Sequence, residues 1–170
     1  MTTPDAPWGE ERSKVISWHD PALLADSAVE LSGRDFLAAI VEGRLPPPPI
    51  AKLLGLDLVS AGDGAAVFRC EADESVYNPI GTVHGGWLCT ILDSAAGCAI
   101  QTLLPAGVGY SSIEIKVSFL KAVRTGSGPL EVTGRALKLG RRVGFAEAHA
   151  RDGSGDLVGH ATTSVAVLRP

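Results

Sequence analysis

The sequence predicts an α+β fold in which one buried helix precedes a set of antiparallel strands. Residues 85–103 predict the helix, because apolar side chains occur nearly all around it and Asp93 is its only charged residue. Four runs of strand-like residues, separated by short glycine-rich turns, predict an antiparallel sheet in which successive strands are neighbours. These runs are 112–120, 130–139, 143–151 and 157–168. A chain of 170 residues can bury one sizeable core.

The chain divides into an N-terminal arm with one helix, residues 1–45, and a main domain, residues 46–170. The first 30 residues are mixed in charge and contain several prolines and two tryptophans. We expect this segment to be ordered in part by docking of Trp8 and Trp18. The arm is therefore predicted to decorate the main domain.

Local signals place the elements that precede the buried helix. Ser32 can cap a helix, apolar residues recur at helical spacing over 36–41, and Gly43 ends it. Four consecutive prolines, 46–49, predict an extended connector that excludes helix. Residues 56–71 predict two short strands around a Gly-Asp-Gly turn.

The sheet and the buried helix carry matching surfaces. One face of the strand at 143–151 has only very small side chains, which allow a helix to lie close. These residues are Gly144, Ala146, Ala148 and Ala150. The apolar side of the helix is formed by Leu88, Ile91, Leu92, Ala95 and Ala99. We expect this side to face the sheet.

Composition excludes several classes of function. The net charge is −4 and no segment is strongly basic, so nucleic-acid binding is not expected. No apolar run approaches the ~20 residues that span a bilayer, and the N-terminus lacks the apolar stretch of a signal peptide. We therefore expect a cytoplasmic protein without membrane partners. Three cysteines without a paired motif, and four histidines without ligand spacing, predict neither a disulfide, nor a metal site, nor a cofactor.

The stretch from Tyr77 to Gly86 leads into the buried helix and ends in two glycines. Glycine is costly inside a helix but gives a ligand close access to backbone N–H groups. A helix N-terminus also carries unpaired donors and partial positive charge, which suit an anion or a developing oxyanion. The alternative is a tight turn in which the glycines only satisfy backbone angles.

Asp93 is the second informative residue. A carboxylate within an apolar helix must be paired, hydrogen-bonded or protonated. It shares a narrow stripe of small or polar residues with Gly86, Thr90 and Gly97, so we expect it to face a cleft or a neighbouring subunit rather than its own sheet. The alternative is a structural aspartate. Eight helical residues separate Gly85 from Asp93 by ~12 Å, so the two could act on one bond only across a two-fold axis.

The spaced pattern Asn78-x-x-Gly81-x-x-His84-Gly85-Gly86, followed by Asp93, resembles the signature of hotdog-fold acyl-CoA thioesterases, most closely their PaaI-like phenylacetate-pathway branch. The resemblance covers about residues 50–168. It implies a central helix wrapped by a curved antiparallel sheet, and a homodimer that assembles into a dimer of dimers. It also implies hydrolysis of an aryl- or fatty-acyl-CoA without a cofactor.

The resemblance further implies residue roles. The Gly85 amide would polarise the thioester carbonyl, Asn78 would hold the water or the oxyanion, and His84 would shape the loop. Asp93 of the partner subunit would be the general base or nucleophile. Ser112 would support that acid, with Ser111 as the adjacent alternative, because successive residues of a strand face opposite ways.

Other residues are candidates for contacts with the substrate. We expect Gly86 and Ser111 to contact the substrate. Arg141 and Arg142 are candidate partners for the coenzyme A phosphates. Lys121 and Arg124 are further phosphate candidates. Trp87 could narrow the acyl pocket, but we expect it to pack in the dimer interface.

Alternative mechanisms and functions are less favoured by the sequence. A serine hydrolase would need a GxSxG motif, which is absent, and no neighbour in sequence would activate Cys89 as a nucleophile. Two other functions remain open. One is an enoyl-CoA hydratase or dehydratase that uses His84 and Asp93. The other is an acyl-CoA-binding protein without activity.

Overall fold

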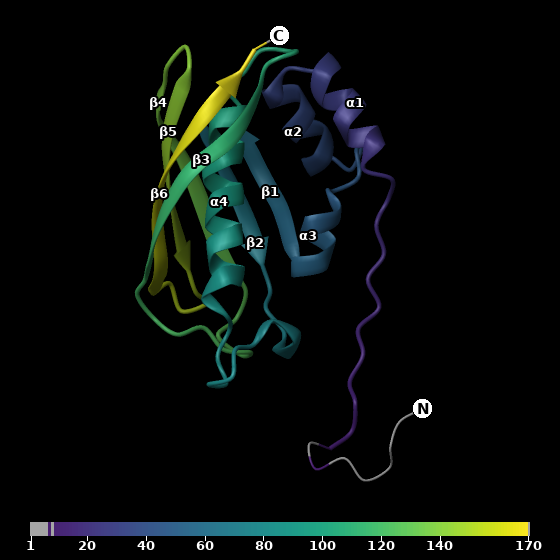
Figure 1. Ribbon diagram of the computed structural model, residues 1–170, viewed down its shortest axis with the longest axis vertical. Coiled ribbons are helices and arrows are strands. Elements are labelled where there is room, and N and C mark those ends of the chain that lie inside the picture. Colours follow the sequence, from purple (N-terminus) through teal and green to yellow (C-terminus); the bar gives the residue numbers. More distant parts are fainter. Residues whose placement is uncertain (1–6, 8, 170) are drawn as a thin grey trace.

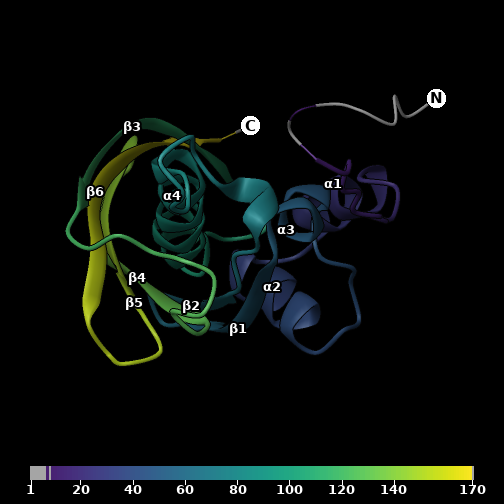
Figure 2. The ribbon, with the colours of Figure 1, turned by 90° about the horizontal axis from the view of Figure 1, so that it is seen from below.

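A computed structural model describes residue 7 and residues 9–169 of the chain. Six antiparallel strands form one curved sheet in the order β1-β2-β4-β5-β6-β3, and helix α4 lies against its inner face (Figures 1 and 2). The strands are β1 Leu56–Gly62, β2 Ala65–Cys70, β3 Gly109–Phe119, β4 Leu130–Leu139, β5 Val143–Arg151 and β6 Leu157–Leu168. The helices are α1 Ala22–Glu30, α2 Gly33–Val41, α3 Pro49–Leu54 and α4 Gly85–Gln101, with a short 3-10 turn at Glu74–Val76. The predicted α+β class is confirmed.

The position of β3 differs from the expectation that successive strands are neighbours. The strand pairs with β6 at the far edge of the sheet instead of with β4. The ten residues between β3 and β4 are enough to cross the open end of the sheet, so the glycine-rich turn at 126–129 does not close a hairpin. The sheet can then wrap around α4, as the view along the helix in Figure 2 shows.

Helix α4 packs unusually close to the strands. Its predicted apolar side is buried, with Leu88 at 3% exposure and Ile91, Leu92, Ala95 and Ala99 at 0%. The predicted small residues Ala146, Ala148 and Ala150 of β5 are equally buried. The closest approach is on β4 at Gly134, where an added Cβ atom would lie 2.0 Å from the carbonyl oxygen of Ala95.

We therefore expect Gly134→Ala to destabilise the protein strongly. The added methyl group meets helix backbone, which cannot rotate away, so the free energy of unfolding should fall by about 3 kcal/mol. Urea denaturation measures this. Gly62→Ala in β1 is the matched control, because its Cβ would meet nothing within 4 Å. Equal stability of the two variants would contradict the close packing of α4 on β4.

The N-terminal segment contains two helices where one was expected. Helix α2 begins after Ser32, whose side chain accepts a hydrogen bond from the Asp35 amide, as predicted. Helix α1 was not predicted. Its first amide, of Ala22, donates to the side chain of Asp20, and its sequence is rich in the helix formers Ala and Leu. Helix α2 docks firmly, because the Gly33 amide donates to the carbonyl of Leu104.

Two further expectations for the N-terminal region are wrong. Trp18 is 60% exposed, so it does not dock on the domain; Trp8 lies outside the described residues. The proline run does not exclude helix throughout, because Pro49 occupies the first position of α3. The missing N–H of proline costs nothing at that position, where no intrahelical acceptor exists.

The described part of the chain contains no helix that is both long and apolar enough to cross a membrane. Within residues 9–169 all three cysteines are free; Cys70 is buried and the other two are half-buried.

Candidate active site

The loop before α4 is held by hydrogen bonds from Asn78. Its side-chain oxygen accepts from the amides of Ile80 and Thr82, at 3.1 and 3.2 Å, and its Nδ2 donates to Thr82 Oγ1 at 2.9 Å. Gly81 adopts a positive φ of 75° within this turn. The side-chain amide of Asn78 therefore holds the turn in place through hydrogen bonds within its own loop.

His84 caps the helix. Its Nδ1 accepts a hydrogen bond from the Gly86 amide at 2.9 Å, which requires that nitrogen to be unprotonated. The His84 carbonyl accepts from the amide of Trp87. Within the described residues the Gly85 amide has no acceptor. The helix therefore presents one unused backbone donor at its positive end.

Local packing also accounts for the glycines at positions 85 and 86, because a side chain at either position would meet a neighbouring ring. A Cβ atom on Gly85 would lie 3.0 Å from the ring of Phe119, and one on Gly86 would lie 2.9 Å from Nδ1 of His84. Gly85 thus makes room for an aromatic ring, and Gly86 makes room for the cap. Phe119 is 57% exposed, so the ring covers the start of the helix from the solvent side.

Asp93 lies half-buried on α4 and contacts the edge strand β3. Ser112 Oγ donates to a carboxylate oxygen of Asp93 at 2.9 Å. Ser111, its neighbour, faces the other side of the strand. The expectation that Asp93 faces away from its own sheet is therefore wrong. The curvature of the sheet brings β3 around to the polar stripe of the helix (Figure 2).

Tyr110 also borders this carboxylate, two residues before Ser112 on the same face of β3. An added Cβ on Gly97 would lie 2.4 Å from the Tyr110 hydroxyl, so that glycine allows the ring to lie against the helix. Burial raises the pKa of Tyr110 well above its usual value, with further contributions from Cys98 and Asp93. Tyr110 is thus a neutral hydroxyl. Sequence reasoning missed it, and its only signal was the i, i+2 spacing from Ser112.

The cysteines near Asp93 are not activated thiols. Burial raises the pKa of Cys98 to about 12, and burial together with the charge of Asp93 raises the pKa of Cys89. Both side chains are therefore protonated near neutral pH, and a protonated thiol is a poor nucleophile. The carboxylate is the better-placed reactive group in this part of the molecule.

The structure does not bring Gly85 and Asp93 together within one chain, because eight helical residues separate them by ~12 Å. A hollow of about 350 Å³ lies beside Gly85 and is lined also by Asn78, Phe119 and Lys121. Asp93, Ser112 and Tyr110 lie together near the start of β3. Gly85 lies near Phe119, at the opposite end of that strand. Within one chain the hollow at Gly85 and the Asp93–Ser112 pair are therefore two separate places.

The phosphate candidates lie apart from one another. Arg141 and Arg142 form the β4–β5 turn, at the C-terminal end of α4 and away from Gly85 of the same chain (Figure 1). Lys121 binds the carboxylates of Asp152 and Asp156, at 2.6 and 2.7 Å, so its charge is already neutralised. Arg124 donates to the carbonyl of Gly81 beside the loop.

Trp87 is 4% exposed, and its indole N–H donates to the carbonyl of Leu54. It packs in the core of its own chain, so the expectation that it packs in a dimer interface is wrong. The indole N–H finds a partner inside the chain, which lets the whole ring be buried there.

A central helix wrapped by a curved antiparallel sheet is the architecture of the hotdog fold class. A family profile described as "Thioesterase superfamily" matches residues 80–159. The protein of Halobacterium salinarum named "Putative esterase VNG_1336C" is 30% identical over 118 residues, which cover 66% of this chain and 76% of that one. This chain belongs to the thioesterase superfamily.

Two further similarities extend this result. Acyl-coenzyme A thioesterase 13 of Homo sapiens is 28% identical over 95 residues, which cover 55% of this chain and 66% of that protein. A crystal structure of a phenylacetic acid degradation-related protein from Ralstonia eutropha JMP134 superposes with a TM-score of 0.69 at 27% identity. That match covers 76% of this chain and 98% of the other, so the predicted resemblance to PaaI-like proteins is confirmed.

Proposed function

We propose that this protein is an acyl-CoA thioesterase, which hydrolyses the thioester of an aryl- or fatty-acyl-CoA to the free acid and coenzyme A. The observation that carries the proposal is the Asp93–Ser112 pair on the polar stripe of α4, in a chain whose α4 begins with an unused amide at Gly85. Membership of the thioesterase superfamily supports it, as does the similarity to a protein named as an acyl-CoA thioesterase.

The active unit is a homodimer in which two copies of α4 run antiparallel. The outer edge of β3 is unpaired within the described residues, and two large apolar side chains on this strand, Ile113 and Phe119, are each 57% exposed. An exposed edge of this kind favours pairing with another chain. A two-fold axis there would bring the Gly85 end of one helix opposite Asp93 of the partner subunit. A dimer of dimers remains our expectation for the larger assembly.

The reaction needs few groups. The carboxylate of Asp93 removes a proton from water, whose oxygen attacks the thioester carbonyl carbon; direct attack by the carboxylate is the alternative. The Gly85 amide of the other subunit donates to the carbonyl oxygen as negative charge develops there. The C–S bond then breaks, and the coenzyme A thiolate leaves and takes up a proton. Ser112 keeps the carboxylate oriented through its hydrogen bond.

Release of free thiol from acyl-CoA esters tests the proposed function. The purified protein should hydrolyse members of a panel that includes phenylacetyl-, benzoyl-, acetyl-, octanoyl- and decanoyl-CoA. Formation of a 3-hydroxyacyl product from an enoyl-CoA without thiol release would instead indicate a hydratase. Tight binding of every ester with no turnover would indicate a binding protein, and either result would refute the proposal.

A further inference from the structure

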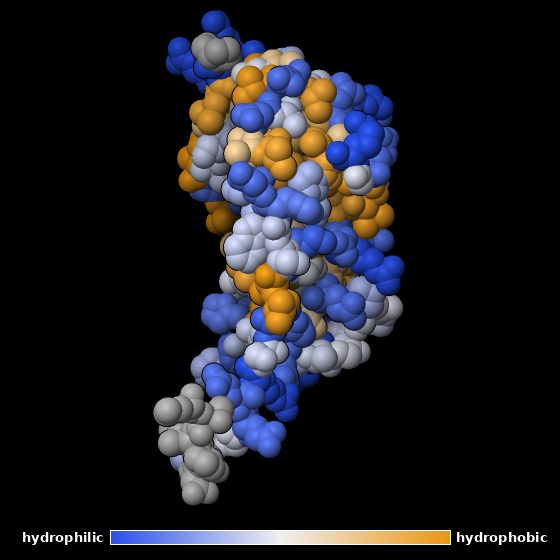
Figure 3. All heavy atoms as spheres, turned by 90° about the vertical axis from the view of Figure 1, so that its right-hand side faces the viewer, coloured by the Kyte–Doolittle hydropathy of each residue, from blue (hydrophilic) through white to orange (hydrophobic). Residues whose placement is uncertain are grey.

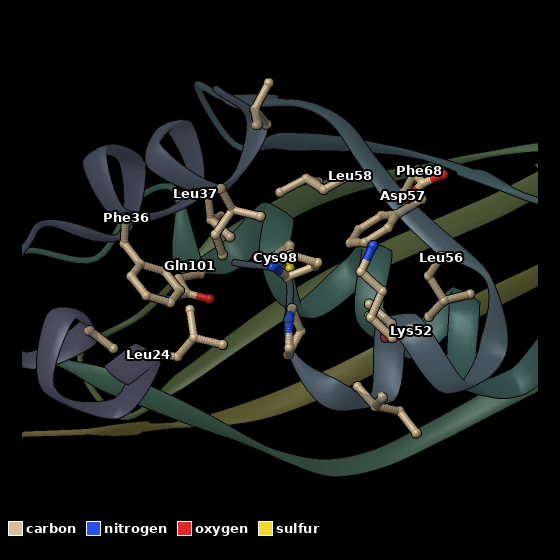
Figure 4. A pocket seen from close by; sticks show the side chains of 18 of the residues that line it. Leu24, Phe36, Leu37, Lys52, Leu56, Asp57, Leu58, Phe68, Cys98 and Gln101 are labelled. Atoms are coloured by element: carbon tan, nitrogen blue, oxygen red, sulfur yellow. The ribbon is translucent and has the colours of Figure 1, made fainter. Parts of the chain in front are cut away.

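A second cavity, of about 620 Å³, lies on the side of α4 that carries the N-terminal helices (Figure 4). Its walls come from α1, α2, α3 and β1, and its floor is the stretch of α4 that contains Ser94, Cys98 and Gln101. Leu24 and Phe36 stand at one end of the cavity, and Leu56 and Phe68 stand at the other. Its size is that of a small-molecule site rather than of a packing defect.

The lining of this cavity is mostly apolar. Fourteen of its twenty residues are aliphatic, proline or phenylalanine side chains, and its charged residues, Lys52 and Asp57, are both exposed. Apolar side chains also emerge on the outer surface over α1–α3 (Figure 3). The cavity thus offers burial to a hydrocarbon group, with no buried charge for which a polar ligand would be needed.

The cavity begins beside the candidate active site. Ser94 follows Asp93 directly on α4, and Tyr110 lines the cavity while lying two residues from Ser112 on the same face of β3. The charge of Asp93 contributes to the raised pKa of both Tyr110 and Cys98, which also line the cavity. A group bound at Asp93 is therefore within reach of the cavity past the ring of Tyr110.

We propose that this cavity binds the acyl chain of the substrate, and that the N-terminal helices α1 and α2 make the enzyme selective for medium to long straight-chain acyl groups. The inference rests on the proposed thioesterase function. Ser94 and Gln101 lie ~10 Å apart along the helix. An extended chain advances ~1.2 Å per bond, so this floor accommodates about eight carbon–carbon bonds.

The occupant predicted by these dimensions is a hydrocarbon chain of about eight to twelve carbons. Each methylene group that enters an apolar cavity should strengthen binding about fourfold. We therefore expect kcat/KM to rise steeply from acetyl- to decanoyl-CoA, and benzoyl-CoA to be a weaker substrate than decanoyl-CoA.

Filling the cavity from α1 tests the proposal. Ala28 is half-buried and lines the cavity, so Ala28→Phe should place a ring where the acyl chain lies. We expect kcat/KM for decanoyl-CoA to fall about tenfold or more, while acetyl-CoA hydrolysis stays within about twofold. Ala22→Phe is the matched control, because Ala22 is exposed on the same helix and does not line the cavity. It should keep the preference for decanoyl-CoA.

A second variant and a binding measurement cover the cases in which Ala28→Phe does not fold or no ester is hydrolysed. If Ala28→Phe fails to fold, Ala25→Phe introduces the same ring from an exposed position at the rim of the cavity. An unchanged chain-length profile in a folded variant would overturn the proposal while leaving the thioesterase function intact. If no ester is hydrolysed, calorimetry measures the affinity of the wild type and of the Ala28→Phe variant for decanoyl-CoA, and the variant should bind more weakly. Equal affinity of the wild type and the Ala28→Phe variant would then overturn it.

Discussion

Asp93→Asn is expected to reduce kcat for acyl-CoA hydrolysis by about 10²–10⁴-fold, the range for loss of a general base. The amide has nearly the same shape and can still accept the hydrogen bond that Ser112 Oγ donates to the carboxylate. The fold and the proposed dimer should therefore persist, because only the basicity of the side chain is lost. Free-thiol release under saturating substrate measures the effect.

The control for this variant separates catalysis from stability. Circular dichroism and the thermal midpoint should match those of the wild type, and KM should change little. Full activity in a folded Asp93→Asn protein would exclude Asp93 as the base or nucleophile. Lost activity accompanied by a collapsed thermal midpoint would instead assign Asp93 a structural role.

Gly85→Pro is expected to reduce kcat by about 10²–10³-fold, the effect seen when one oxyanion donor is removed. Proline has no N–H, and it suits the first position of a helix. The preceding residue, His84, already has the extended backbone that proline requires, with φ −64° and ψ 135°. The substitution therefore removes the donor and leaves the start of α4 in place.

Gly85→Ala is the matched control, because it adds a Cβ atom but keeps the N–H. Both substitutions press on the ring of Phe119, whose exposed side can move. We expect the alanine variant to retain activity within about tenfold of the wild type, since its amide still reaches the carbonyl oxygen. Equal losses in the two variants would mean that crowding near Phe119 matters and that the amide does not.

Much of the fold follows from local sequence patterns. The bounds of β4, β5 and β6 agree with the prediction, because each is a strand-like run between glycine-rich turns. The place of β3 could not be predicted, since its pairing with β6 joins segments about 50 residues apart and leaves no local mark. Helix α1 was missed because its apolar periodicity is short and its N-cap residue is Pro21, which offers no side-chain acceptor; the acceptor for the Ala22 amide is Asp20, one residue further back.

The candidate site was predictable in part. The lone charge in the apolar helix singled out Asp93, and the family resemblance singled out Ser112 with Ser111 as its alternative; the structure places the side chains of Asp93 and Ser112 in contact. The internal hydrogen bonds of Asn78 and the ring of Phe119 over Gly85 depend on three-dimensional packing, which residue spacing does not describe. The cavity beside α1 and α2 could not be predicted for the same reason, because its lining comes from seven separate helices and strands.

Subunit complementation tests most directly whether each site takes its amide and its acid from different chains. Asp93→Asn and Gly85→Pro proteins, each nearly inactive alone, are unfolded together, refolded as an equimolar mixture and assayed. Random pairing gives mixed dimers in which one site carries both defects and the other carries neither, so about a quarter of wild-type activity should return. If the mixture stays as inactive as its components although mixed dimers have formed, each chain builds its site alone and the shared-site account is wrong.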